Sequence, residues 1–125
     1  MRVAMDANAL MMPVEVGVRV FEEVERLLGA YECVVPATVR AELSKLAESG
    51  GDEGRAASVG LDLAADCETV ETEESYADDA LFALATSGRV DTVVTNDAPL
   101  RERLLDAGVP VIHLRGRNQL TITQP

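Results

Sequence analysis

The chain alternates short apolar segments with longer amphipathic segments along its whole length, and this alternation restricts the possible folds more than any other feature. The predicted strands cover residues 2–5, 33–35, 67–70, 92–95 and 109–114. The predicted helices cover residues 14–28, 37–47, 55–65, 76–86 and 99–107, with a flexible surface loop over residues 49–54. Strands that alternate with helices of this length favour a parallel sheet covered on both faces. In such sheets, ligands bind beyond the carboxyl ends of the strands.

The composition is that of an ordinary globular domain. A chain of 125 residues with 47% hydrophobic and 26% charged residues can bury a core without additional cross-links. Cys33 and Cys67 lie in apolar segments and are predicted to be free, buried thiols. Together with His113 they are too few for a four-ligand zinc site. No apolar run could cross a bilayer and no signal-peptide pattern opens the chain, which predicts a cytoplasmic protein.

The charge balance is unusual. The chain has 22 acidic residues against 11 basic ones, a formal net charge of -11, and Lys45 is its single lysine. This pattern is typical of proteins from a very salty cytosol and predicts a halophilic protein. Such a charge opposes nucleic-acid binding in dilute buffer. In molar salt the Debye length falls to about 3 Å, so the long-range repulsion largely disappears.

Two acidic residues come at or just beyond the ends of predicted strands. Asp6 comes after Val3-Ala4-Met5, and Asp97 follows the fourth strand. A carboxylate after so apolar a run is costly unless something pairs with it, and no helix-capping role is expected for Asp6. Asp97 precedes Ala98-Pro99, so helix capping is an alternative role for it. Both side chains are predicted to face the cleft at the carboxyl end of the sheet.

Glu42 lies inside or at the edge of the apolar stripe of its predicted helix. Val39, Leu43 and Leu46 form that stripe, and Glu42 is three residues after Val39 and four before Leu46. An ordinary solvated glutamate would lie on the opposite face, and the alternative is a partly solvated position at the stripe's edge. We therefore expect Glu42 to be a functional carboxylate.

Two adjacent aspartates open the predicted helix at residues 76–86. An acidic residue there interacts favourably with the positive end of the helix dipole. The spacing Ser75-x-x-Asp78 matches a capping box, which gives Asp78 a structural role. Asp79 is therefore predicted to face the cleft, and the choice between Asp78 and Asp79 stays open.

Several carboxylates that converge on one cleft repel one another unless cations neutralise them. Oxygen ligands of this kind suit Mg²⁺ or Mn²⁺ rather than zinc. The chain offers no nearby cysteine, no useful histidine and no Gly-rich phosphate loop. The cluster therefore predicts metal-assisted hydrolysis of a phosphodiester, in which an activated water attacks the phosphate in line.

Four short motifs and a closing segment carry a family resemblance. In chain order they are Met5-Asp6-Ala7-Asn8, Val35-Pro36-x-x-Val39-x-x-Glu42-Leu43, Ala77-Asp78-Asp79-Ala80-Leu81, Val94-Thr95-Asn96-Asp97 and Gly108-Val109-Pro110-Val111-Ile112. Together they resemble the PIN domain ribonucleases across essentially the whole chain. The resemblance is to the branch that holds VapC-type toxins and small-subunit rRNA-processing factors.

This resemblance implies a single PIN-like nuclease domain over residues 1–125. The implied fold is a three-layer α/β/α sandwich with a central parallel sheet of about five strands. The implied metal-binding and catalytic acids are Asp6, Glu42, Asp79 and Asp97, supported by Asn8, Thr95 and Asp78. The expected cofactor is Mg²⁺ or Mn²⁺ and the expected activity is endoribonucleolytic. RNA contacts are expected from Arg101, Arg103, Arg115 and Arg117, for which a solvated surface position is the alternative.

The expected partners are RNA and either an antitoxin protein or a ribosomal precursor, and a homodimer is a further expectation. One alternative from another class is a non-catalytic PIN module that binds RNA or protein in ribosome assembly. A haloacid-dehalogenase-like phosphatase fits less well, because Asn8 stands where its second aspartate belongs and Lys45 is poorly placed. A phosphoacceptor receiver domain fails as well, because its acidic pair should follow the first strand.

Overall fold

A computed structural model describes all 125 residues. Its central sheet has six strands in the order β3-β2-β1-β4-β5-β6. The strands are β1 (Arg2–Met5), β2 (Glu32–Pro36), β3 (Glu68–Val70), β4 (Thr92–Val94), β5 (Val111–Arg115) and β6 (Gln119–Thr123). The helices are α1 (Ala7–Glu15), α2 (Val20–Leu28), α3 (Ala37–Ala47), α4 (Gly51–Ala64), α5 (Ala77–Thr86) and α6 (Ala98–Asp106).

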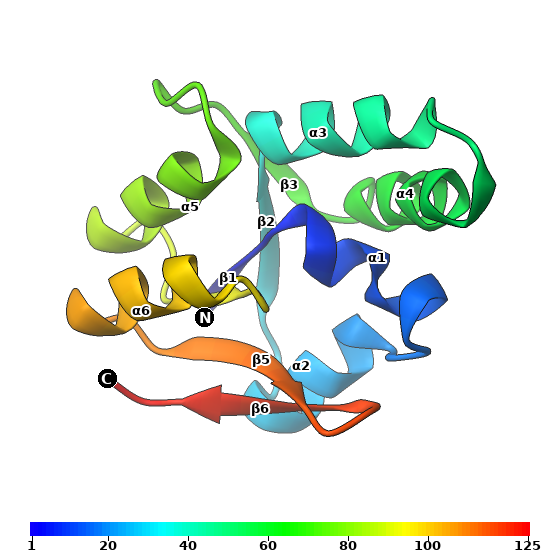
Figure 1. The fold of residues 1–125 in the computed structure, drawn as a ribbon. Coiled ribbons are helices and arrows are strands. Elements are labelled where there is room, and N and C mark those ends of the chain that lie inside the picture. Colours follow the sequence, from blue (N-terminus) through cyan, green and yellow to red (C-terminus); the bar gives the residue numbers. More distant parts are fainter.

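The helices form a layer on each side of the sheet. In Figure 1, α5 and α6 lie on one side of the strands and α1, α2 and α4 on the other, while α3 runs across the end where β2 finishes. One continuous core fills both interfaces, and β1 is buried at Val3, Ala4 and Met5. None of the six helices is both long and apolar enough to span a membrane. The predicted α/β/α sandwich is confirmed.

The first five strands in chain order are parallel, as predicted, and the sixth runs antiparallel to β5. The sequence analysis missed β6. Its segment alternates apolar Leu120 and Ile122 with polar residues, which is the period of a half-buried strand. Gly116 adopts a positive φ of 68° in the short turn from β5, as a tight hairpin needs. The closing residues therefore extend the sheet.

The N-terminal helical region differs from the prediction. A single helix over residues 14–28 was expected, but α1 begins directly after Asp6 and α2 follows a break at residues 16–19. Gly17 lies in that break with a φ of 71°, a left-handed conformation that ends α1. The apolar residues 9–12 of α1 are all buried in the common core, because this helix packs against α4.

The loop predicted over residues 49–54 is also wrong in extent. Helix α4 begins at Gly51, so only Glu48, Ser49 and Gly50 connect it to α3. A Cβ at Gly54 would lie 3.3 Å from the carbonyl oxygen of Ala47. The missing side chain therefore lets the first turn of α4 approach the end of α3 closely.

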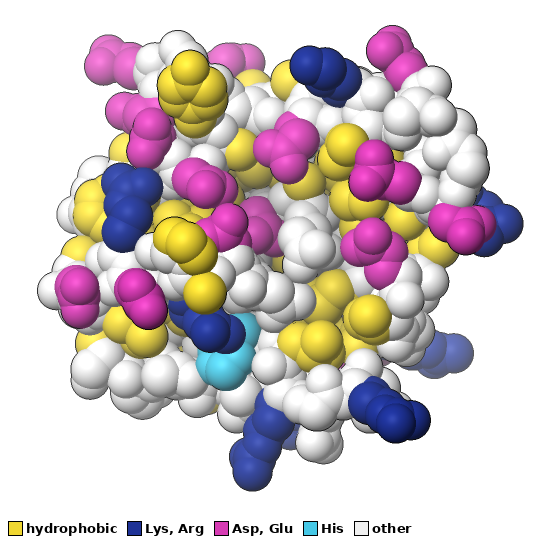
Figure 2. Space-filling view, in the orientation of Figure 1, with side chains coloured by type: hydrophobic (Ala, Val, Ile, Leu, Met, Phe, Trp, Pro, Cys, Tyr) yellow, Lys and Arg dark blue, Asp and Glu magenta, His cyan; other side chains and the backbone are white.

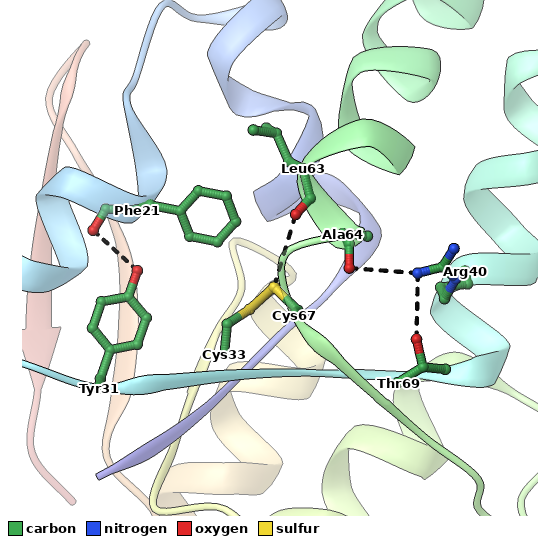
Figure 3. The surroundings of a disulfide bond; sticks show 8 residues. All are labelled: Phe21, Tyr31, Cys33, Arg40, Leu63, Ala64, Cys67 and Thr69. Atoms are coloured by element: carbon green, nitrogen blue, oxygen red, sulfur yellow. Dashed lines mark hydrogen bonds between the residues drawn. A yellow bond between two sulfur atoms is a disulfide. The ribbon is translucent and has the colours of Figure 1, made fainter.

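A disulfide joins Cys33 to Cys67, and the prediction of two free thiols is wrong. The parallel register pairs Val34 with Glu68, which places Cys33 opposite Cys67 on the neighbouring chain segment, with a Cα–Cα distance of 4.8 Å. Figure 3 shows the bond between β2 and the segment that follows α4. The cross-link thus holds the three-residue edge strand β3 to the sheet.

Candidate active site

The chain reversals after four strands surround a polar cavity of about 260 Å³. Its lining combines four carboxylates, two side-chain amides and two alanines, and includes no basic residue. These residues are Asp6, Ala7, Asn8, Glu42, Ala77, Asp78, Asn96 and Asp97. The cavity lies at the carboxyl ends of the parallel strands, where the sequence predicted a ligand site.

Asp6 is the most deeply placed of the four acids, with 7% of the residue exposed. Its Oδ1 accepts a hydrogen bond from the Ala9 N–H at 2.7 Å, so Asp6 caps α1, contrary to the expectation that it has no capping role. Burial raises the pKa of Asp6 from 3.8 to about 7. The hydrogen bonds from Thr95 and Ala9 oppose that rise, and the charges of Asp78 and Glu42 add to it.

Thr95 connects two of the acids. It is fully buried; its hydroxyl donates to Asp6 Oδ2, and its Oγ1 accepts from the Asp97 N–H at 3.1 Å. Asp97 in turn caps α6, because its Oδ1 accepts from the Leu100 N–H at 2.9 Å. Asp97 therefore has the capping role that was open to it and also lines the cavity.

Glu42 reaches the cavity from the middle of α3. Val39 and Leu43 of that helix are buried, and Glu42 lies at the exposed edge of their stripe. Partial desolvation by the cleft and the nearby charge of Asp78 raise the pKa of the Glu42 carboxyl. A raised pKa from these two causes shows that the cleft disfavours another negative charge.

Asp78 lines this cavity, whereas Asp79, which the sequence analysis expected to face the cleft while leaving the choice open, lines only the adjoining hollow. Tyr76 is the residue that precedes α5 and no side-chain bond caps the helix, so the predicted capping box does not form. The pKa of Asp78 is raised by desolvation and by the charge of Asp97, while Arg103 lowers it. Asp79 instead forms an ion pair with Arg103 at 3.2 Å on the rim.

Asn96 belongs to the cavity lining, although the sequence analysis gave it no role beyond its place in the Val94-Thr95-Asn96-Asp97 motif. Its Oδ1 accepts the Leu114 N–H at 2.7 Å, and its Nδ2 donates to Asn8 Oδ1 at 3.2 Å. The side chain therefore ties the end of β5 to Asn8 on α1. Its position beside Asp97, directly after a strand, is the sequence signal that could have identified it.

The four predicted RNA-contacting arginines lie in different places. Arg103 borders the cleft through Asp79, and Arg101 is half-buried on α6. Arg115 and Arg117 are exposed where β5 turns into β6, at the same edge of the sheet as the cavity. Figure 2 shows acidic side chains over the upper and middle parts of this face and basic ones along its lower edge.

The donor set of the cavity fits a hard divalent cation. All of its polar side chains present carboxylate or amide oxygens, which are ligands that Mg²⁺ and Mn²⁺ accept. No three acidic, histidine or cysteine side chains lie close enough to form a ready-made metal-binding group. Such a group is not required for Mg²⁺, because this ion usually keeps several of its waters and takes only one or two protein carboxylates.

Comparison with known proteins places these features in a family. A family profile described as a PIN like domain matches residues 3–117. Ribonuclease VapC4 of Methanocaldococcus jannaschii is 27% identical over 125 residues, which covers 97% of this chain and 95% of that protein.

Solved structures share the fold. The structure of the PIN domain endonuclease Utp24 superposes with a TM-score of 0.80 at 23% identity, covering 99% of this chain and 92% of that chain. The VapBC2 structure from Rickettsia felis, bound to a promoter DNA fragment, gives a TM-score of 0.60 at 13% identity, with 82% and 92% covered. VapBC-1 from nontypeable Haemophilus influenzae gives 0.53 at 17% identity, with 85% and 94% covered. The profile spans nearly the whole chain, and the chain belongs to the PIN domain family.

Proposed function

We propose that this protein is a metal-dependent endoribonuclease whose active site is the cavity lined by Asp6, Glu42, Asp78 and Asp97. The observation that carries the proposal is a cavity with four carboxylates and no basic side chain, in a chain of the PIN family. A relative that aligns along almost the full length is named a ribonuclease. Such a cavity attracts cations, and it accepts a phosphodiester only once its negative charge is offset.

The four carboxylates would hold one or two Mg²⁺ or Mn²⁺ ions. When bound, such an ion lowers the pKa of a coordinated water and neutralises charge on the leaving oxygen. Asp6 is held for this role by two hydrogen bonds, one from Ala9 and one from Thr95. Asn8, whose Oδ1 accepts from Asn96, would present its amide N–H groups to a phosphate or a ligand water. Preorganised donors of this kind lose little free energy to reorganisation during the reaction.

The arginines at the edge of the cleft would contact the RNA backbone. Arg103 lies beside α5, while Arg115 and Arg117 lie at and beyond the carboxyl end of β5, at the same edge of the sheet as the cavity. Phosphates on either side of the scissile bond could therefore contact cationic side chains while the scissile phosphate itself lies over the acids.

The cellular partner depends on whether the protein acts as a VapC-type toxin or as an rRNA-processing factor. Similarity to VapC-type proteins favours an antitoxin, and similarity to rRNA-processing factors favours a ribosomal precursor. Cleavage of free RNA by the purified chain is common to both roles and absent from a purely binding module.

The test is cleavage of end-labelled single-stranded RNA with Mg²⁺ or Mn²⁺ and with EDTA. We expect cleavage at internal sites only when the divalent ion is present, and loss of cleavage in Asp97→Asn. The ends of the products report the nucleophile, since attack by water leaves no cyclic phosphate. If the RNA stays intact across a panel of sequences and metals, the non-catalytic binding module is favoured. A 2′,3′-cyclic phosphate at the product ends would show that the ribose 2′-hydroxyl, and not water, is the nucleophile.

A further inference from the structure

Tyr76 is the one strongly exposed aromatic residue of the chain. The other three aromatic side chains, Phe21, Tyr31 and Phe82, pack against the core, whereas Tyr76 is 74% exposed. It lies directly before α5, two residues from Asp78, in an extended conformation. A ring so exposed beside the acidic cavity is free to contact a bound ligand through its face.

A second hollow of about 500 Å³ extends from the acidic cavity to Tyr76. The two hollows share Glu42, Ala77, Asp78 and Asp97, so they form one cleft with an inner and an outer part. Only the outer part has an aromatic ring and a basic side chain in its lining, those of Tyr76 and Arg103. A nucleotide bonded to a phosphate in the inner part would therefore extend into this outer part.

Arg103 is held in place on the outer part of the cleft. Its guanidinium lies 4.4 Å from the centroid of the Phe82 ring and pairs with Asp79 at 3.2 Å. Phe82 and Asp79 are both on α5, three residues apart, so a single helix fixes the position of the cation. The outer part thus offers a flat apolar ring together with an oriented cation, the combination used to bind unpaired nucleotides.

We propose that Tyr76 stacks on the base of a nucleotide next to the scissile phosphate, with Arg103 contacting that nucleotide's backbone. This inference rests on the proposed function and adds a positioning residue to it. Stacking on one ring face tolerates every base, because each base has a π-face. It requires that base to be unpaired, so a duplex of the same sequence cannot use the site.

Binding measurements test the proposal on the intact chain. Fluorescence anisotropy follows a labelled single-stranded RNA with Mg²⁺ in the Asp6→Asn background, which should not cleave it. Adding Tyr76→Ala should weaken binding by about 5- to 150-fold, the range of one lost base–aromatic stack. Tyr76→Phe keeps the ring and should retain most of the affinity. Because the side chain is exposed, both variants should melt at the parent temperature.

Tyrosine emission gives a second readout, because the chain has no tryptophan and only two tyrosines. In a Tyr31→Phe variant, Tyr76 is the single emitter, and a stacked base should quench it, whereas the RNA duplex should not. Equal affinity of Tyr76→Ala and its parent, or emission indifferent to single-stranded RNA, would overturn the stacking role. If the stacking role is overturned but the wild type still cleaves RNA, the proposed nuclease function is retained without the Tyr76 site. Quenching without any cleavage by the wild type would reject the nuclease proposal and leave the binding site.

Discussion

Asp6 carries two roles that conflict in the absence of a cation. Its carboxylate caps α1 and accepts from Thr95, yet it is buried with Glu42 and Asp78 nearby. Hydrogen bonds favour the ionised form, and burial with like charge favours the neutral form. The second effect prevails, since the pKa of Asp6 is raised to about 7. A bound divalent ion would reverse that balance.

The first prediction concerns stability against pH. The unfolded chain titrates Asp6 near 3.8 and the folded chain near 7, so the folded state binds more protons between these values. The free energy of unfolding should therefore fall, by a few kcal/mol at most, as the pH rises from about 4 to about 7 without divalent ions. Glu42 and Asp78 contribute with the same sign.

Asp6→Asn should lose most of this slope and equal or exceed the wild type in stability above pH 7. Melting temperatures of both proteins in EDTA across this pH range measure the effect. Parallel curves for the two proteins would show that Asp6 is not the group responsible.

Thr95 supports the second prediction. Thr95→Val keeps the shape but leaves Asp6 Oδ2 and the Asp97 N–H without their partner. The expected loss is about 1–3 kcal/mol in the free energy of unfolding, the cost of an unpaired buried polar group. Thr95→Ser, which keeps the hydroxyl, is the matched control and should be less affected. Urea unfolding of the wild type, Thr95→Val and Thr95→Ser measures these free energies. Equal stability of the two variants would show that the Thr95 hydroxyl does not stabilise the fold.

The sequence held enough information to choose Asp78 over Asp79. The buried stripe of α5 includes Leu81 and Ala85, which are three and seven residues after Asp78 and therefore on its face. The same reasoning identified Glu42 on α3. A capping-box pattern at Ser75 misled the choice, because the chain is still extended at Tyr76 and Ser75 does not begin the helix.

At the scale of elements, the regular alternation of strands and helices made the parallel five-stranded core predictable. The failures lie where a local signal was weak or was overridden by packing. Helix α1 is nearly all apolar and so shows little amphipathic periodicity, and the first turn of α4 contains Gly54, whose missing side chain allows the close contact with α3. The partner of a cysteine depends on strand register, which a single sequence does not reveal.

The third prediction concerns the link between β2 and β3. The Cys33–Cys67 bond closes a loop with a sequence separation of 34 residues, and its loss should lower the free energy of unfolding by about 2–4 kcal/mol. A dithiol reductant should produce this loss in the wild type. The double variant Cys33→Ala/Cys67→Ala should already have the lower stability and be insensitive to the reductant. A wild type that ignores the reductant and carries two titratable thiols would contradict the bond.

At the scale of the whole molecule, a net charge of -11 makes the acidic surface repel both itself and RNA. The fourth prediction is that the melting temperature and the cleavage rate at fixed Mg²⁺ both rise with KCl, because salt screens these repulsions. Phosphate contacts weaken with salt, but the chain has few basic residues to make them. A KCl titration measures both quantities. If stability and activity are greatest in low salt, the halophilic interpretation is refuted, while the nuclease proposal is unaffected.

The inner carboxylates of the cleft are proposed to bind the cation that cleavage needs. The most direct measurement compares Asp78→Asn with its neighbour Asp79→Asn in a Mn²⁺ titration that follows binding and RNA cleavage in the same samples. Asp78 lines the inner cavity and Asp79 does not. We predict that Asp78→Asn loses Mn²⁺ affinity and cleavage together, by at least about 10- to 100-fold, the range seen for residues that merely orient a metal ligand. Asp79→Asn should keep the Mn²⁺ affinity nearly intact, and its loss of cleavage, which would arise only through its ion-pair partner Arg103, should be smaller than that of Asp78→Asn. Equal losses in the two variants, or cleavage by the wild type in EDTA, would contradict the account.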